Sequence, residues 1–309
     1  MLSVEQRKRY PIPIGTSPSA MQKLVGDDGG IDMAKAAGIR GTNMILSSHT
    51  TCTLEDVIQA PGGDNVVDFW FQLYISQNRE RSSGYEAIVL TVDTPVLGNR
   101  INEQNAIGSS SPSFSRDSTP NERPPKAEPT MNRILLEARN ARAATEITLE
   151  NHDTLNDASL TWSDTMPWLC SRTNLKIILK GIMTAEDTLL AIGHGADAII
   201  VSNNEGRQLD SVPSRIEVLP EIVSAVRGRV PVIIDSGITR GSDAFKALAL
   251  GADFTLVGRS ALWGLNFGGR EGVERVLDIL ERELSRMMAL VGVGFLRTTI
   301  RRVLIKHVF

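Results

Sequence analysis

The sequence predicts an α/β protein folded as a (β/α)8 TIM barrel. Short apolar runs alternate along the chain with stretches of helical periodicity. Two segments, 195–201 and 251–257, repeat one template of a helix-ending glycine, a short turn and a buried strand. Several apolar runs end in polar residues, as parallel strands do where their carboxyl ends open on a site. The alternative is a doubly wound open sheet, but no GxGxxG motif follows any expected strand.

The eight strands are expected where short apolar runs are bounded by turn-forming or polar residues. In chain order they cover 10–15, 42–46, 66–74, 86–90, 177–179, 198–201, 230–234 and the apolar part of 251–257. The second strand ends in Ser47, Ser48 and His49, and the last ends in Gly258 and Arg259. These endings favour a polar site at one end of the barrel.

Helices are expected between the strands, each marked by a capping or a terminating residue. They cover 32–39, 53–60, 131–149, 161–169, 184–193, 241–250 and 270–290. Gly41 ends the first helix, and the run Pro61-Gly62-Gly63 ends the second. Residues 161 and 184 are threonines followed three positions later by aspartate, which is an N-terminal capping pattern.

Two connections depart from a regular barrel. Residues 102–130, which follow the fourth strand, are rich in serine, proline, asparagine and charge, so they are expected to form a long surface loop or a disordered insert. Only residues 75–85 join the third and fourth strands, which is a shortened crossover for parallel strands. The whole chain, 1–309, is expected to be one barrel domain.

Composition limits the function classes. The net charge is −3, so nothing indicates binding to nucleic acid or to an anionic membrane surface. Hydrophobic residues make up 41% and charged residues 22% of the chain, as in a soluble globular protein. The two cysteines, Cys52 and Cys170, lack CxxC spacing, which argues against a disulfide scaffold and a thiolate zinc site. No metal site is expected.

The two ends of the chain bear on its compartment. The N-terminus lacks the apolar core of a signal peptide, and no apolar run approaches the roughly 18 residues of a membrane span. The C-terminus, which ends in His307-Val308-Phe309, is not a Ser-Lys-Leu peroxisomal signal. We therefore expect an intracellular protein, cytoplasmic or peroxisomal.

Polar residues collect at the carboxyl ends of the expected strands, which meet on one face of a barrel. They are Ser47, Gln72, Tyr74, Thr91, Asp93, Lys180, Ser202, Asn203, Asp235 and Arg259. Lys180 is the most informative, because a lysine after an apolar strand needs an anionic partner or a route to water. A snorkelling lysine and a structural ion pair stay open as alternatives. Gly237, Gly258 and Arg259 lie where barrels often bind phosphate, after strands seven and eight.

Several motifs resemble the FMN-dependent 2-hydroxy acid oxidases and dehydrogenases, the family of glycolate oxidase, lactate oxidase and flavocytochrome b2. The similarity runs from about residue 11 to about 295. The matching segments are 17–22, 46–48, 71–74, 90–95, Leu97-Gly98 with Arg100, Lys180-Gly181, 201–203 with Gly206-Arg207-Gln208-Leu209-Asp210, and 241–252. So many motifs in the same order make a chance match improbable.

The resemblance implies roles for the matching residues. FMN would be lined by Ser17, Pro18, Ser19, Ala20, Ser47, Gln72, Thr91 and Ser202, and its phosphate held by Asp235, Gly237, Gly258 and Arg259. Lys180 would face the flavin and stabilise negative charge on it after reduction. Tyr74, Arg100 and Arg207 would bind a small 2-hydroxy acid, with the guanidinium groups paired to its carboxylate. The electrons would pass to oxygen or another acceptor.

One departure from the family concerns catalysis. The family motif reads Ser-Asn-His-Gly-Gly (or Ala)-Arg-Gln-Leu-Asp, whereas residues 202–210 read Ser-Asn-Asn-Glu-Gly-Arg-Gln-Leu-Asp. Asn204 therefore stands at the position of the general base, and Asp93 at that of the carboxylate that orients it. A carboxamide takes no proton at neutral pH, although Asn204 could hydrogen-bond to Asp93 and preserve the shape of the site.

Other departures concern the cofactor and the chain termini. Thr239 replaces an arginine on the phosphate side of the family's site, and His49 replaces an aromatic residue that borders the substrate, where it could be a relocated base. The chain begins almost at the first strand, so the family's N-terminal segment, with its substrate-contacting tyrosine, is expected to be missing and the barrel bottom partly uncovered. The resemblance also suggests a homo-oligomer, because the family often forms tetramers.

Together these patterns predict an FMN-dependent oxidoreductase that takes a small 2-hydroxy acid to a 2-oxo acid, with activity reduced by Asn204. Two alternatives stay open. The first is a catalytically inactive FMN-binding pseudoenzyme with a binding or assembly role. The second is a truncated barrel that does not hold FMN.

Overall fold

The computed structural model describes residues 10–60, 67–75, 85–95 and 158–292. Within these ranges the strands are β1 (Ile14–Thr16), β2 (Met44–Ser47), β3 (Phe69–Leu73), β4 (Ala87–Thr91), β5 (Lys176–Ile182), β6 (Ala198–Val201), β7 (Val232–Ile234) and β8 (Phe254–Val257). The α-helices are α1 (Gly30–Arg40), α2 (Leu54–Gln59), α6 (Trp162–Arg172), α7 (Ala185–Gly193), α8 (Arg215–Val226), α9 (Gly241–Ala249) and α10 (Arg259–Leu290). Two short 3-10 helices are η2 (Gln22–Leu24) and η4 (Asn204–Gly206).

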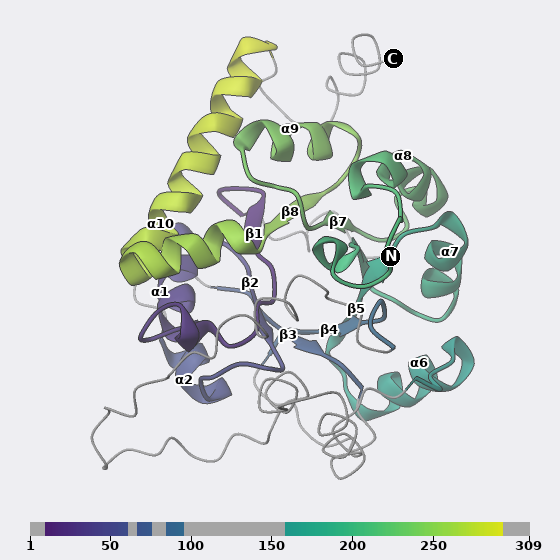
Figure 1. The fold of residues 1–309 in the computed structure, drawn as a ribbon. Helices are drawn as coiled ribbons and strands as arrows, with labels where there is room; N and C mark the ends of the chain where they lie inside the picture. The colour runs from purple at the N-terminus through teal and green to yellow at the C-terminus, as the bar shows by residue number, and fades with distance from the viewer. Residues whose placement is uncertain (1–9, 61–66, 76–84, 96–157, 293–309) are drawn as a thin grey trace.

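The strands form a closed barrel in the order β1 to β8, and each strand pairs in parallel with its neighbours. The helices surround this barrel (Figure 1). The (β/α)8 expectation is therefore confirmed. None of the helices in the described part of the chain is both long and apolar enough to cross a bilayer.

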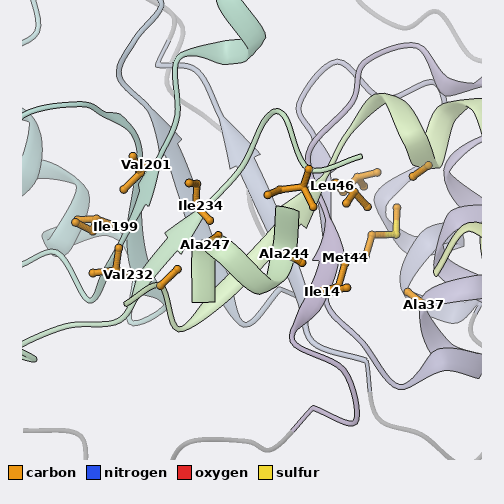
Figure 2. Close-up of a cluster of buried hydrophobic side chains, with 14 of the residues drawn as sticks. Ile14, Ala37, Met44, Leu46, Ile199, Val201, Val232, Ile234, Ala244 and Ala247 are labelled. Carbon is orange, nitrogen blue, oxygen red and sulfur yellow. The ribbon is translucent and has the colours of Figure 1, made fainter. Parts of the chain in front are cut away.

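Side chains alternate along the strands between two apolar layers. Ile199 and Val201 of β6 belong to the larger cluster, which packs between the strands and the surrounding helices (Figure 2). Ala198 and Ile200 of the same strand belong to a second cluster, in the barrel interior. That interior cluster comprises Ile45, Ala87, Val89, Ile178, Ala198, Ile200, Ile233, Phe254 and Leu256.

The expected caps are confirmed for three helices. The hydroxyls of Thr53, Thr161 and Thr184 accept hydrogen bonds from the backbone N–H three residues later, at 3.1, 3.2 and 3.1 Å. Each cap satisfies one of the donors left free at a helix start. The T-x-x-D pattern therefore fixes where α2, α6 and α7 begin.

Several boundaries differ from the sequence-based expectation. β1 begins at Ile14 rather than residue 10, because Pro11 and Pro13 have no N–H to give to a sheet. β5 extends to Ile182 and so contains Lys180. The helix expected at 270 belongs to α10, which already begins at Arg259 and loses helical geometry at Gly268 and Gly269. No helix was expected at the place of α8, whose interior contains Pro220.

Some expectations lie outside the described residues. They are the insert at 102–130, the helix at 131–149, Arg100, and residues 76–84 of the third crossover. The structure does show β3 and β4 as adjacent parallel strands, with residues 74–86 between them.

Gly181 lies at an irregularity in β5, where the pairing with β6 shifts register between Lys180 and Ile182. Its φ of +111° is a conformation that side chains rarely adopt. A methyl group on Gly181 would lie 2.7 Å from Asp93 Cβ and 2.8 Å from Asp93 N. The absence of a side chain therefore allows the loop after β4 to pack directly on β5.

We predict that Gly181→Ala lowers the free energy of unfolding by about 3 kcal/mol, through backbone strain and overlap with Asp93. Gly193→Ala is the matched control, because it lies at the end of α7 and an added methyl group would meet nothing within 4 Å. The control should be neutral or stabilising by up to about 1 kcal/mol. Urea unfolding of both variants checks this, and equal stabilities would contradict it.

Candidate active site

A layer of buried polar side chains closes the barrel at the carboxyl ends of the strands. Residues two apart on a strand face the same way, so each inward apolar residue predicts the next inward position. On β5, for example, Ile178 is inward and is followed by Lys180. The corresponding residues are Ser17, Ser47, Gln72, Thr91, Lys180, Ser202 and Asp235, each at most 7% exposed. Six of them were expected at the carboxyl ends of the strands, and the family resemblance implied the seventh, Ser17.

Lys180 is the charged centre of this layer. Its Nζ lies 3.3 Å from Asp235 Oδ2 and donates to Ser202 Oγ at 3.0 Å. Asp235 Oδ1 in turn accepts a hydrogen bond from Ser236 Oγ at 2.9 Å. Burial alone lowers the pKa of Lys180, but the carboxylates of Asp235 and Asp93 outweigh it and raise that pKa. Lys180 is therefore a buried cation, not a lysine that snorkels to water.

Three other members of the layer have buried polar atoms without a hydrogen-bond partner among the described residues: Ser17 Oγ, Gln72 Nε2 and Thr91 Oγ1. Gln72 Oε1 accepts from Ser47 Oγ at 3.2 Å and from the Ser48 backbone N–H at 3.3 Å. These bonds leave the amide N–H groups as donors for something else. Each unsatisfied buried group costs about 1–3 kcal/mol, so such a set indicates a ligand with polar edges.

Asp93 follows β4 and packs on Gly181. Its Oδ1 accepts from Thr94 Oγ1 at 2.9 Å, whereas its buried Oδ2 has no partner in the described structure. The pKa of Asp93 is raised by burial, and the charge of Lys180 only partly opposes this. The sequence suggested that Asn204 could hydrogen-bond to Asp93; no such bond is formed at Oδ2, which has no partner among the described residues.

That turn is η4, which carries Asn204 and Glu205 at φ values of +50° and +60°. The Asn204 backbone N–H donates to Ser202 Oγ at 3.2 Å, so the turn is tied to the same hydroxyl that accepts from Lys180. Gln208 Nε2 donates to the Asp93 carbonyl at 3.4 Å. The loop after β6 therefore lies beside the loop after β4, as the sequence motifs require. Arg207 is exposed on this loop.

His49 and Tyr74 mark another part of the same face. Their rings stack with centroids 5.4 Å apart. The loop after β1 contacts the backbone of His49, where the Met21 N–H donates to the His49 carbonyl at 3.0 Å. Burial lowers the pKa of His49, so its imidazole is neutral at neutral pH. Tyr74 is close enough to Lys180 to contribute to its raised pKa. The segment Pro18-Ser19-Ala20 is half-buried beside them.

The residues expected to bind phosphate converge after β7 and β8, but with two unexpected neighbours. Arg259 Nε pairs with Glu205 Oε2 at 2.6 Å. The guanidinium of Arg215 lies against Gly237, where a methyl group would come within 2.8 Å of its Nη2. Neither Glu205 nor Arg215 was expected at this site from the sequence. The signal for Glu205 was present, since it replaces a glycine in the family's motif.

The raised pKa of Asp93 yields a stability prediction. Its folded-state pKa lies above the unfolded value of about 3.9, so the folded state holds this proton more tightly. Stability is therefore lost as pH rises through the folded pKa. Asp93→Asn should raise the Tm at pH 7, and the gain should vanish below about pH 4. Calorimetry at both pH values checks this, and a variant that melts lower at pH 7 would contradict it.

Comparisons with known proteins agree with this geometry. The family model described as FMN-dependent dehydrogenase matches residues 7–306. A 2-hydroxyacid oxidase of Dictyostelium discoideum is 44% identical over 292 residues, covering 91% of this chain and 69% of that protein. An L-lactate oxidase of Nostoc is 40% identical and covers 91% of this chain and 76% of its own length.

Solved structures give the same result. A mandelate oxidase with (S)-4-hydroxymandelic acid superposes with a TM-score of 0.75 at 32% identity, covering 91% of this chain and 76% of that one. A mandelate oxidase variant that carries a monooxide FMN adduct superposes with a TM-score of 0.69 at 31% identity, with the same coverage. The unsatisfied donors and the buried lysine fit such a flavin. The chain therefore belongs to the FMN-dependent 2-hydroxy acid oxidase family, and FMN is its cofactor.

Proposed function

We propose that the buried polar layer binds the FMN ring, that a small 2-hydroxy acid binds above it, and that this acid is oxidised slowly to the 2-oxo acid. One observation carries the proposal: Ser17, Gln72 and Thr91 present unsatisfied buried groups beside the buried cation of Lys180. A planar ligand with polar edges would satisfy these donors and acceptors. Pro18, Ser19, Ala20, Ser47 and Ser202 complete the proposed lining.

Lys180 has the electrostatic role in this proposal. When bound, FMN supplies a two-electron acceptor. Asp235 and Asp93 keep Lys180 charged although it is buried. Its positive charge would therefore stabilise negative charge on a ligand bound next to it. Ser202 fixes the ammonium by accepting one of its hydrogen bonds. The ammonium group is thus already held in place by Asp235 and Ser202.

The proposed substrate site lies over Tyr74, beside the loop that carries Arg207. A guanidinium pairs with a carboxylate through two parallel hydrogen bonds, which suits a 2-hydroxy acid. Arg100 is proposed to share this role, and it lies outside the described residues. The relatives named above are oxidases, so oxygen is the proposed electron acceptor, with another acceptor as the alternative.

Proton removal is the weak step of the proposed reaction. Asn204 stands where the family motif has histidine, and a carboxamide is no base. Asp93 keeps its place but has no imidazole to orient. Loss of a positioned base costs about 10²- to 10⁴-fold in rate. The proposal is therefore an intact cofactor site with an impaired proton acceptor.

We predict that Asn204→His accelerates flavin reduction by about 10²- to 10⁴-fold. The measurement is the loss of visible flavin absorbance after anaerobic addition of glycolate or L-lactate to the FMN-loaded protein. Asn266→His is the control, because it adds an imidazole on the exposed surface of α10. Equal rates in the parent and in Asn204→His would contradict the assignment of this position.

Asn204 also favours a second candidate, a catalytically inactive flavoprotein with a binding or assembly role. Both candidates require FMN to bind. They differ in whether the unmodified protein reduces its flavin when a 2-hydroxy acid is added. Flavin bands that bleach slowly with either acid support the slow oxidase. Bands that persist in the parent but bleach in Asn204→His support the inactive flavoprotein. A chain that takes up no FMN would contradict both.

His49 is the proposed source of any remaining base. Its imidazole is neutral near pH 7 and stacks on Tyr74, at the proposed substrate site. We predict that His49→Ala abolishes the slow bleaching of the parent. His194→Ala is the control, because this half-buried histidine follows α7: its Nδ1 lies 2.9 Å from the Leu190 carbonyl of that helix, and its ring stacks on Trp162. Unchanged bleaching in His49→Ala would exclude the role.

The compartment and the oligomeric state remain predictions. The relative from Arabidopsis thaliana named peroxisomal (S)-2-hydroxyacid oxidase is 40% identical, which suits the proposal of a cytoplasmic or peroxisomal protein. A homo-oligomer is proposed from the family resemblance alone.

A further inference from the structure

An ion pair joins the loops after β6 and β8 at the proposed phosphate end of the FMN site. Glu205 Oε2 lies 2.6 Å from Arg259 Nε, and a methyl group on Gly258 would lie 3.2 Å from Glu205 Oε1. The Glu205 side chain is only 19% exposed. Its carboxylate therefore contacts Gly258 and Arg259, two of the four residues expected to hold the phosphate.

A second guanidinium, that of Arg215, lies close enough to this carboxylate to interact with its charge. Arg215, the first residue of α8, donates from Nη1 to Asn203 Oδ1 at 2.8 Å, and its Nη2 lies against Gly237. Its buried Nε has no hydrogen-bond partner in the described part of the chain. Burial lowers the pKa of Arg215, while the nearby charges of Asp235 and Glu205 oppose this. Arg215 is thus a half-buried cation with hydrogen-bonding capacity left over.

The backbone shows that the carboxylate is held in place at a cost. Glu205 adopts a φ of +60°, in the left-handed region that favours glycine, and the family motif has glycine at this position. Its N–H donates to Ser236 Oγ at 3.2 Å, which fixes the turn to the loop after β7. Glu205 thus keeps a carboxylate paired with Arg259, and within reach of the charge of Arg215, in a backbone conformation that disfavours a side chain.

Thr239 leaves the phosphate side of the site without one of the family's positive charges. The family has an arginine here, whereas the Thr239 N–H and hydroxyl both donate to Asp243 Oδ2, at 3.2 and 3.1 Å. Thr239 therefore helps to cap α9 and brings no charge to the site. Arg215 approaches the same loop from α8 and puts a guanidinium at Gly237, two residues before Thr239.

We propose that Arg215 and Arg259 together bind the phosphate monoester of FMN, and that Glu205 is an internal anion that the phosphate displaces. This inference rests on the proposed FMN site. A phosphate carries more charge than a carboxylate and offers more acceptor oxygens to two guanidinium groups. The existing pair is easy to replace, because the Arg259 side chain is 61% exposed and partly exposed ion pairs are weak.

The test compares FMN with riboflavin, which lacks the phosphate. Flavin-free protein is titrated with each by quenching of flavin fluorescence. Arg215→Gln should weaken FMN binding about tenfold or more and leave riboflavin affinity within about twofold. Glu205→Gln should strengthen FMN binding about threefold, again without change for riboflavin. Arg282→Gln and Glu221→Gln, both at exposed positions, are the charge-matched controls and should change neither affinity.

The outcomes separate this inference from the proposed function. Riboflavin affinity reports whether each variant retains a folded flavin site. Arg215→Gln that weakens both flavins equally, or neither, would overturn the phosphate role of Arg215. Glu205→Gln that weakens FMN binding would overturn the displacement by phosphate. A parent that binds both flavins equally would overturn the phosphate assignment while leaving the ring site intact, and a parent that binds neither would overturn the proposed function itself.

Discussion

The buried pair of Lys180 and Asp235 is the interaction on which this site depends. Two charges removed from water are stable only when geometry and extra hydrogen bonds compensate for lost hydration. Ser202 and Ser236 provide those bonds, and both belong to loops that carry other site residues. The pair therefore ties β5, β6 and β7 together at their carboxyl ends. A closed barrel can hold it because all strands are parallel and open on one face.

The two sides of this face differ in chemistry. The side formed by β1, β3 and β4 presents the unpartnered neutral groups of Ser17, Gln72 and Thr91, with the Asp93 carboxyl after β4. The side formed by β5 to β8 carries the pairs Lys180–Asp235 and Glu205–Arg259. A ring with polar edges and an anionic tail matches that division. Asn204 follows β6 and adds neither charge nor basicity. We therefore propose that the chain retains the groups that hold a flavin more completely than those that remove a proton.

Much of this arrangement could be predicted from the sequence. Polar residues at the carboxyl ends of apolar strands were expected to meet on one face of a barrel, so Lys180 and Gln72 were assigned to the correct face. The pairing of Glu205 with Arg259 could not be predicted, because it joins two loops far apart in sequence through a left-handed turn. The position of Arg215 was missed for a related reason, since no helix was expected where α8 begins.

The most direct test is a crystal structure of the protein loaded with FMN. We predict that the flavin ring lies across the inward polar layer, with Gln72 Nε2 and Thr91 Oγ1 hydrogen-bonded to it and Lys180 in contact with its edge. We also expect the phosphate between Arg215 and Arg259. A flavin bound elsewhere, with the Gln72 and Thr91 groups satisfied by water alone, would contradict the assignment of this layer as the cofactor site.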